Sequence, residues 1–389
     1  MKKKIMLIVP MLHQGGFERI CALTAKLLKD KHDVYLVIFS DKDMIYDVTG
    51  VNLINLDLGA VDSKVGKIIN VVKRVRQLKK LKRKLAIDIS YSFGLTANLA
   101  NALSKCQDAV WVGIRGYGAL QEEKKMQLFC KKADMVVSCT KVMDEDINAR
   151  FAPKASATLY NPCNLEEIKK LAAEPVEKQF EEFLQRPGKL IVSMGREDDL
   201  KCFWHLIKSF SLLKKELPDA RLMIIGEGEY VEYRKLAADL GIDEDILFTG
   251  VQKNPFALLA KADVYALTSE TEGFPNALIE AMACGLPCVS VNCKTGPAEI
   301  LNEDFEKCSR QDQVYEGDYG VITPVFVGEK DLQPENFTKE EEIFAKELKK
   351  ILSYEERFFY YKEKAPKRAA DFGMEAYVAN IEKLIEGSR

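Results

Sequence analysis

Several residue patterns are scarce or missing in this chain of 389 residues, and each absence removes a class of function. With only three histidines, His13, His32 and His205, no Ser-His-Asp arrangement for nucleophilic catalysis can be argued. The ten cysteines include no Cys-x-x-Cys pair. This pattern predicts a reduced, cytoplasmic compartment and no metal site.

Two longer patterns are missing as well. No apolar stretch approaches the roughly 18 residues of a membrane-spanning helix. The short apolar run that begins at Ile5 is interpreted as a first strand rather than as part of a signal peptide. No Gly-x-Gly-x-x-Gly is present, which disfavours a dinucleotide, and we expect no cofactor.

The length of the chain and the distribution of its charges both indicate two domains. Residues 1–165 contain 27 Lys and Arg against 16 Asp and Glu, whereas residues 166–389 contain 30 against 43. Two domains of opposite charge are expected to have different partners.

Short aliphatic runs alternate with amphipathic segments along most of the chain, which predicts an α/β fold with parallel sheets covered on both faces. In the first half the predicted strands are 5–9, 34–39, 52–56, 87–90, 109–113, 135–139 and 157–160, with helices over 17–29, 65–84, 96–104, 120–132 and 141–150. After a break at 161–188, further strands are predicted at 190–194, 222–225, 246–248, 264–267 and 288–291, and a final helix at 371–385. This pattern predicts two doubly wound halves, with a ligand in the cleft at the carboxyl ends of their strands.

Two loops that follow predicted strands have residues suited to phosphate. Gly15 and Gly16 separate the first strand from the first helix, so backbone N–H groups could approach an anion there. The segment Gly195-Arg196-x4-Lys201 places a guanidinium and an ammonium after a strand, which suits a diphosphate. The alternatives are an ordinary tight turn at the glycines and, at Arg196, an exposed loop closed by ion pairs to neighbouring acids.

A pair of glutamates, Glu272 and Glu280, is the most informative feature of the chain. Glu280 lies in a helical segment whose near neighbours are all apolar or small, where a carboxylate is costly unless something hydrogen-bonds to it. Glu272 precedes the start of that helix at Pro275, beside the backbone N–H groups of Gly273, Phe274 and Asn276. A ligand with adjacent hydroxyls fits both acids, whereas the alternative is a capping acid plus a buried ion pair.

Two further segments allow competing interpretations. Asp41-Lys-Asp43 resembles a metal-holding Asp-x-Asp, but its position in the first half favours surface turn chemistry. Residues 64–84 carry ten Lys and Arg and no acid on a helix with regular apolar positions. That helix suits an anionic membrane surface, although a solvated outer helix explains it equally well. Nucleic acid is disfavoured because no aromatic residues interleave with these charges.

The order of these motifs resembles family 4 of the retaining glycosyltransferases. The likeness extends along essentially the whole chain, from the glycine pair at 15–16 through 195–201 and the glutamates to Gly296-Pro-Ala-Glu299. The resemblance implies the GT-B fold, two Rossmann-like domains that face each other across a cleft. The N-terminal domain, residues 1–165 completed by the helix 371–389, would bind the acceptor, and residues 166–370 would bind the nucleotide-sugar donor.

The resemblance also implies a role for each matching residue. Arg196 and Lys201 would hold the donor's diphosphate without a metal ion, and Gly15 and Gly16 would face the transferring phosphate. Glu280 would bind the ribose and Glu272 the sugar. The remaining implied donor contacts come from backbone groups of Gly250, Val251, Gly273, Phe274, Pro275 and Asn276.

One position departs from the family pattern. Many relatives have a histidine after the strand at 109–113, where this chain has Ile114-Arg115, so Arg115 could orient the acceptor or stabilise the phosphate. We expect transfer of a hexose or N-acetylhexosamine to a lipid-linked or polysaccharide acceptor, such as a capsule precursor at the membrane's inner face. The expected donor is UDP-linked, and a GDP-linked donor is the alternative. The alternatives are a sugar-nucleotide epimerase of the same fold, which the scarcity of histidine disfavours, and a non-catalytic nucleotide-sugar-binding protein.

Overall fold

The computed structural model describes residues 2–13 and 15–388, and it divides the chain into two compact units. Unit 1 comprises Met1–Pro162 and Met374–Arg389, and unit 2 comprises Cys163–Gly373. Both borders lie three residues away from the predicted ones, at 165 and 370. The first and last residues of unit 2 lie side by side: the Cys163 N–H donates to the Phe372 carbonyl at 2.8 Å.

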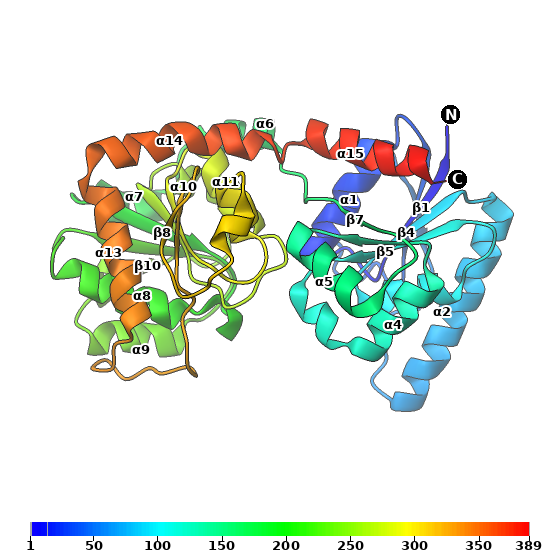
Figure 1. The fold of residues 1–389 in the computed structure, drawn as a ribbon, viewed down its shortest axis with the longest axis horizontal. Helices are drawn as coiled ribbons and strands as arrows, with labels where there is room; N and C mark the ends of the chain where they lie inside the picture. Colours follow the sequence, from blue (N-terminus) through cyan, green and yellow to red (C-terminus); the bar gives the residue numbers. More distant parts are fainter. Residues whose placement is uncertain (1, 14, 389) are drawn as a thin grey trace. The chain divides into compact units, whose positions relative to one another are not determined.

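Unit 1 is built on a seven-stranded sheet in which all neighbouring strands are parallel (Figure 1). The strands are β1 (Lys4–Val9), β2 (Asp33–Ile38), β3 (Asn52–Asn55), β4 (Ile89–Phe93), β5 (Ala109–Ile114), β6 (Met135–Ser138) and β7 (Ser156–Thr158). Their order is β3-β2-β1-β4-β5-β6-β7, so the chain reverses direction across the sheet between β1 and β4. This topology confirms the doubly wound prediction for the first half.

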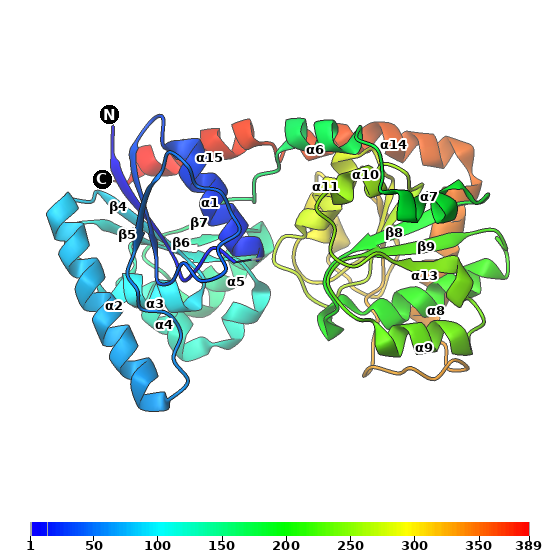
Figure 2. The same ribbon diagram turned by 180° about the vertical axis from the view of Figure 1, so that it is seen from behind.

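Helices cover both faces of this sheet (Figures 1 and 2). The helices of unit 1 are α1 (Gly16–Leu28), α2 (Lys64–Leu85), α3 (Leu95–Leu103), α4 (Glu123–Lys132), α5 (Lys141–Phe151) and α15 (Met374–Gly387). Alternate residues of β1 point to opposite cores: Leu7 packs with side chains of α1 and α15, and Ile8 with side chains of α2 and α3. The near-continuous hydrophobic run of β1 follows from this two-sided burial.

The strand predicted at 87–90 is β4, and its predicted bounds lie too early in the chain. The prediction ended it at Ser90, but the observed strand continues to Phe93 with both serines buried. The Ser92 hydroxyl is satisfied by Asn98 Oδ1 at 2.8 Å, so a polar residue costs little inside this sheet.

Unit 2 repeats the arrangement with a second seven-stranded sheet of order β10-β9-β8-β11-β12-β14-β13. Its strands are β8 (Leu190–Met194), β9 (Arg221–Ile225), β10 (Ile246–Phe248), β11 (Val264–Leu267), β12 (Cys288–Val291), β13 (Tyr315–Glu316) and β14 (Val321–Thr323). All neighbours are parallel except the edge strand β13, which pairs antiparallel with β14. The sheet reverses direction between β8 and β11, the position at which doubly wound folds bind ligands.

Helices separate the strands of unit 2, as the sequence pattern predicted, but the helices over 339–353 and 355–370 were not predicted. They are α6 (Leu165–Ala172), α7 (Lys178–Gln185), α8 (Phe203–Lys214), α9 (Val231–Asp239), α10 (Pro255–Leu259), α11 (Asn276–Ala283), α12 (Pro297–Leu301), α13 (Lys339–Ser353) and α14 (Glu355–Ala370). The final helix was predicted from residue 371, but α15 begins at Met374, and α13 and α14 precede it. The start of α13 has a capping box between Thr338 and Glu341.

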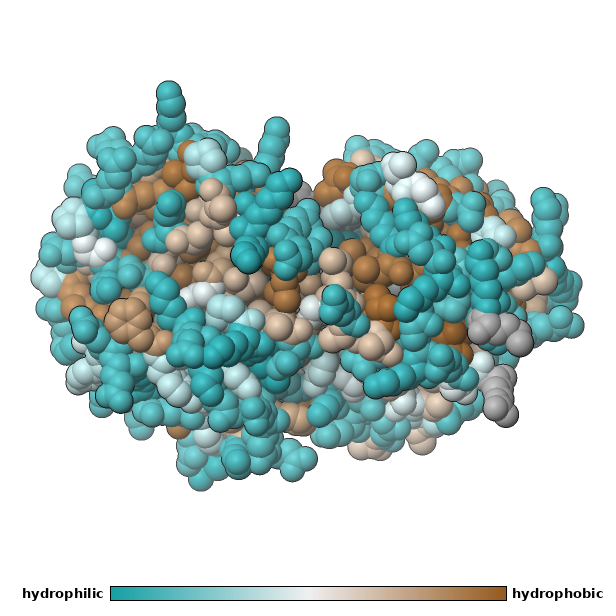
Figure 3. Space-filling model, turned by 90° about the horizontal axis from the view of Figure 1, so that it is seen from above, coloured by the Kyte–Doolittle hydropathy of each residue, from teal (hydrophilic) through white to brown (hydrophobic). Residues whose placement is uncertain are grey.

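The surface of both units is largely polar. On the face that carries α14 and α15, hydrophilic residues cover most of the molecule, with smaller hydrophobic areas between them (Figure 3). Within the described part of the chain, no helix is both long and apolar enough to cross a membrane.

Candidate active site

Most of the predicted donor-site residues follow the carboxyl ends of neighbouring parallel strands in unit 2. Gly195–Lys201 follows β8, Gly250–Val251 follows β10, and the loop at 269–275 follows β11. The loop 226–230 follows β9, which lies between β8 and β10. Parallel strands end at one edge of a sheet, so these four loops meet there.

The structure brings Lys201 and Glu272 into direct contact, although 71 positions separate them in the chain. Lys201 Nζ donates to Glu272 Oε1 at 2.7 Å, and the two side chains are 26% and 12% exposed. The Lys201 turn is held to the end of β11 because the Thr268 hydroxyl donates to the Lys201 carbonyl at 2.9 Å. An acid and a base are therefore paired at the switch point of the sheet.

Glu280 is buried in α11, as its apolar surroundings predicted, with 7% of the residue exposed. Both Glu272 and Glu280 influence the pKa of the buried Tyr265 hydroxyl. Burial raises the pKa of Tyr265 well above its ordinary value, the Glu272 carboxylate raises this pKa further, and Glu280 adds a smaller contribution. Burial and the Glu280 carboxylate likewise raise the pKa of the Cys284 thiol to about 12. The two predicted glutamates thus share one neighbourhood around Tyr265.

Arg196, Gly250 and Val251 line one open cavity of about 700 Å³. The rest of its lining is Glu197, Glu227, Gly228 and Glu229. Arg196 is exposed and makes an ion pair with Asp198 in its own loop, with Nη2 3.1 Å from Oδ2. The loop at Arg196 is thus exposed and closed by an ion pair, as the alternative interpretation of this segment expected. The guanidinium lies at the rim of the cavity.

The segment between the two glutamates offers backbone groups rather than side chains. Phe274 is buried against Phe372, with ring centroids 5.3 Å apart. Pro275 is the N-cap of α11 rather than its first helical residue, and its ring packs closely against Gly296. The Thr295 hydroxyl donates to the Glu272 carbonyl. Gly273 and Asn276 flank these packed residues. Thr295 and Gly296, which follow β12, therefore hold the loop in place.

The glycine pair lies in unit 1, at the end of β1, where Gly15 is the N-cap of α1 and Gly16 its first residue. The Tyr46 hydroxyl donates to the Gly15 carbonyl at 3.1 Å. The carboxylate of Glu18, in the first turn of α1, folds back close to Gly15. The predicted anion site thus has an acid beside it.

Arg115 follows β5 in unit 1, and its guanidinium is bound within that unit. Nη1 donates to the Leu159 carbonyl at 3.0 Å and to Asn161 Oδ1 at 3.2 Å, and Nη2 donates to the Tyr91 hydroxyl. Burial raises the pKa of Tyr91, so the hydroxyl beside Arg115 stays neutral. In this structure Arg115 joins β4 to the segment after β7, and a role toward an acceptor stays a prediction.

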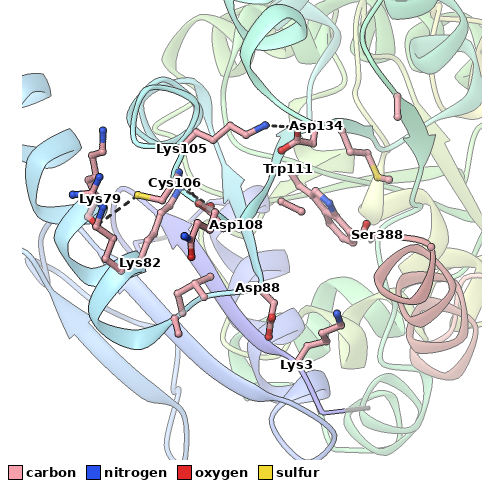
Figure 4. Close-up of a pocket in the computed structure, with 18 residues that line it drawn as sticks. Lys3, Lys79, Lys82, Asp88, Lys105, Cys106, Asp108, Trp111, Asp134 and Ser388 are labelled. Carbon is pink, nitrogen blue, oxygen red and sulfur yellow. Dashed lines mark hydrogen bonds and ion pairs between the residues drawn. The ribbon is translucent and has the colours of Figure 1, made fainter.

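A larger cavity, of about 1170 Å³, lies at the opposite edge of the unit 1 sheet (Figure 4). Its lining includes residues just before β4, β5 and β6 and none of the predicted site residues. Lys82 Nζ and Asp108 Oδ2 pair there at 2.9 Å, almost fully buried, and Lys105 pairs with Asp134. Since these acids and bases neutralise each other, the cavity has no evident place in the predicted chemistry.

The loop 226–230 was not among the predicted site segments. Its Gly226-Glu-Gly-Glu-Tyr230 pattern follows a hydrophobic strand, and two glycines at a strand end could have identified it. Both glycines have backbone angles that side chains rarely adopt, with φ of 150° and 155°. A Cβ on Gly226 would lie 1.9 Å from the Gly195 carbonyl oxygen, and one on Gly228 would lie 2.4 Å from Glu197 Cβ. Tyr265 and Thr295 gave no such signal because they look like ordinary strand and loop residues.

Among the described residues, no group of three His, Cys, Asp or Glu is arranged to hold a metal ion. Asp41 and Asp43 are exposed in a turn, and Asp43 has a positive φ of 53°.

Comparison with known proteins gives a family match and two informative relatives. Residues 176–310 match the family described as glycosyl transferases group 1. An uncharacterized glycosyltransferase of Methanocaldococcus jannaschii is 31% identical over 266 residues, which is 67% of this chain and 65% of that protein. The N-acetylgalactosamine-N,N'-diacetylbacillosaminyl-diphospho-undecaprenol 4-alpha-N-acetylgalactosaminyltransferase of Campylobacter jejuni is 28% identical, over 78% of this chain and 84% of that protein.

A solved structure of similar fold is that of Anabaena Alr3699/HepE in complex with UDP and glucose. It matches 99% of this chain and 100% of its own with a TM-score of 0.75, at 16% identity. The two doubly wound units have the GT-B fold, as predicted. The family match and both relatives are glycosyltransferases, and the matched region spans 65% of the Methanocaldococcus jannaschii protein's length.

Proposed function

We propose that this chain with a GT-B fold is a retaining glycosyltransferase. It transfers a hexose or N-acetylhexosamine from a UDP-linked donor to a lipid-linked or polysaccharide acceptor. The observation that carries the proposal is the Lys201–Glu272 pair at the switch point of the unit 2 sheet, together with the cavity that Arg196, Gly250 and Val251 line. Residues predicted separately from three segments of the chain, after β8, β10 and β11, lie at one edge of one sheet.

The donor is proposed to bind at this edge through opposite charges and hydroxyl contacts. Lys201, released from Glu272, and Arg196, released from Asp198, would hold the diphosphate. Glu272 would then accept hydrogen bonds from sugar hydroxyls, and Glu280 from the ribose. The choice of UDP draws support from the similar solved structure, which is a complex with UDP and glucose.

The chemistry requires departure of the nucleoside diphosphate and attack by an acceptor hydroxyl. Retention with front-face attack needs no protein base, because the leaving phosphate can take the acceptor's proton. Arg196 and Lys201 would stabilise the negative charge that develops on that phosphate, and we propose that they do so without a metal ion.

The acceptor is proposed by analogy with a relative. The Campylobacter jejuni relative is named for an acceptor linked to undecaprenol through a diphosphate. We extend the class of lipid-linked acceptors, but not the particular sugar, to this chain. The reaction would then belong to the synthesis of a surface polysaccharide such as a capsule.

A donor screen tests the enzyme assignment. UDP- and GDP-linked sugars are incubated with and without a lipid-linked acceptor, and nucleotide release and the anomeric configuration of the product are measured. Acceptor-dependent release with retained configuration, unchanged by a chelator, is expected. Release without transfer, or an altered donor sugar, would favour the epimerase, and binding without either would favour a non-catalytic protein. Release that Glu272→Ala and Glu280→Ala leave unaffected would exclude the assigned site.

We also propose that unit 1 docks on an anionic membrane surface through α2. Of its ten basic residues, Arg74 and Lys82 are buried and used internally, and the others are exposed or half-buried. The outer side of its first half has an apolar stripe with exposed fractions of 43% to 68%: Val65, Ile68, Ile69 and Val72. An exposed apolar stripe beside lysines is typical of helices that lie in a membrane interface.

Vesicle binding tests this docking. The protein should sediment with vesicles of anionic phospholipid at low salt, less so at high salt, and weakly with neutral vesicles. Ile68→Asp should reduce sedimentation several-fold, since it places a carboxylate in the apolar stripe. Val231→Asp is the matched control, because Val231 is also exposed but lies in unit 2. Equal sedimentation of both variants and the wild type would contradict the assignment to α2.

A further inference from the structure

The cavity in unit 2 is shaped by contacts between three loops, and one side chain joins two of them. Gly226 N–H donates to the Gly250 carbonyl at 3.1 Å, which links the loop after β9 to the loop after β10. Glu197 N–H donates to the Glu227 carbonyl at 2.6 Å, which links the loop after β9 to the loop after β8. The loop 226–230 is therefore the central wall of the cavity.

The Glu197 carboxylate makes the strongest of these links. Its Oε2 accepts the backbone N–H groups of Glu229 at 2.9 Å and of Tyr230 at 2.8 Å. Tyr230 is the N-cap of α9, and no side chain at that position caps the helix. Glu197 thus supplies from another loop the negative charge and the acceptor that a helix N-terminus requires.

The packing around Glu197 leaves the loop little freedom to move. Gly228 lies so close to Glu197 that no side chain would fit between them, and the Tyr230 hydroxyl donates to the carbonyls of Gly195 and Glu227 at 3.2 and 3.3 Å. Burial and then the Glu197 carboxylate raise the pKa of Tyr230, so this hydroxyl remains a donor at neutral pH. Arg196, the predicted diphosphate ligand, lies between Gly195 and Glu197 in the turn that these contacts hold.

We propose that Glu197 is a positioning residue, whose carboxylate locks the loop 226–230 against the Arg196 turn and so holds the nucleotide cavity in its binding shape. The inference rests on the proposed function, because it takes a nucleoside diphosphate as the ligand. Glu197 does not reach reacting atoms in this role. Its loss should therefore weaken donor binding and leave the chemical step nearly unchanged.

The test compares three variants in the full chain. Glu197→Ala removes both hydrogen bonds, and Glu197→Gln keeps an oxygen that can accept them without the charge. Glu229→Gln removes the same charge from the same cavity, but no hydrogen bond to that carboxylate is found among the described residues. Calorimetric binding of UDP, the KM and kcat for the donor, and hydrogen exchange at the amides of residues 229 and 230 are measured for each.

We expect Glu197→Ala to weaken UDP binding and raise the KM on the order of tenfold, the scale of losing charge-assisted hydrogen bonds, with kcat within about twofold. Exchange at both amides should accelerate, Glu197→Gln should restore part of the affinity, and Glu229→Gln should behave as the wild type. Unchanged UDP binding by Glu197→Ala, or an equal loss with Glu229→Gln, would overturn the inference. A wild-type protein that binds neither UDP nor GDP would instead overturn the proposed function. The hydrogen-exchange rates are measured without ligand, so they test whether Glu197 holds the loop 226–230 independently of that function.

Discussion

Units 1 and 2 share the order of their first five parallel strands around a central switch point, yet they use the charges at the carboxyl edge differently. In unit 1 the guanidinium of Arg115 is bound by carbonyl and hydroxyl groups of its own fold. In unit 2 Lys201 and Glu272 pair with each other, and Arg196 lies at the rim of a cavity. The two units therefore place charge differently: Arg115 is held within the fold of unit 1, whereas Arg196 lies at a cavity in unit 2, because the loops at the carboxyl edge differ.

Substitution of Glu272 should have the largest effect on activity. Glu272→Ala removes the partner of Lys201 and the proposed sugar contact, so kcat/KM should fall roughly a hundredfold, the scale of losing one group aimed at the transition state. Initial rates with the best donor of the screen measure the fall, and thermal unfolding checks that the fold persists. Glu270→Ala is the matched control, since Glu270 is exposed in the same loop. A similar fall in the control would show that the loop, rather than the Lys201 pair, is responsible.

Substitution of Arg115 should instead affect stability. Arg115→Ala leaves the Leu159 carbonyl and the Tyr91 hydroxyl without their donor, so the free energy of unfolding should fall by about 2–4 kcal/mol. Denaturant unfolding measures this loss, with Arg76→Ala, an exposed arginine on α2, as the control. Donor binding by the folded fraction should be unchanged. A stable variant that has lost only transfer to the acceptor would show that Arg115 belongs to the active site, and would remove the contrast between the units.

The smallest effect is expected at the amino edge of unit 1, where Asp134 lines the larger cavity. Burial opposes its charge, but the Lys105 ammonium and the Val110 N–H outweigh burial and lower the pKa of Asp134 from its ordinary value. Because this pKa is lowered on folding, its stabilisation is present above the unfolded-state pKa and disappears as the pH falls through the folded-state pKa. Asp134→Asn should therefore cost less than about 1 kcal/mol at pH 7, since the side chain is partly exposed.

Unfolding of wild type and Asp134→Asn across pH 2–7 checks this expectation, and the difference in stability should shrink with acidification. Asp62→Asn serves as the control, because Asp62 is exposed in the same unit. A difference between wild type and Asp134→Asn that stays constant with pH would show that packing rather than charge is involved.

The sequence predicted the fold well because hydrophobic periodicity is a local property. Each predicted strand overlaps an observed one, and the helix that contains Glu280 is buried as its neighbours indicated. One error has a physical cause, because β4 continues past Ser90 where Asn98 satisfies the Ser92 hydroxyl. The helices α13 and α14 were overlooked although α13 begins with a capping box. The roles of the predicted site residues stay predictions until the variants are measured.

By itself the sequence determined the order of the motifs, the alternation of strands and helices, and the burial of one glutamate in an apolar helix. Only the tertiary structure decided which charges meet: Lys201 with Glu272, Arg196 with Asp198, and Arg115 with carbonyls of its own unit. The physical reason is the separation along the chain over which each feature is determined. Periodicity is set by neighbours along the chain, whereas an ion pair between residues 71 positions apart depends on how the sheet places its loops.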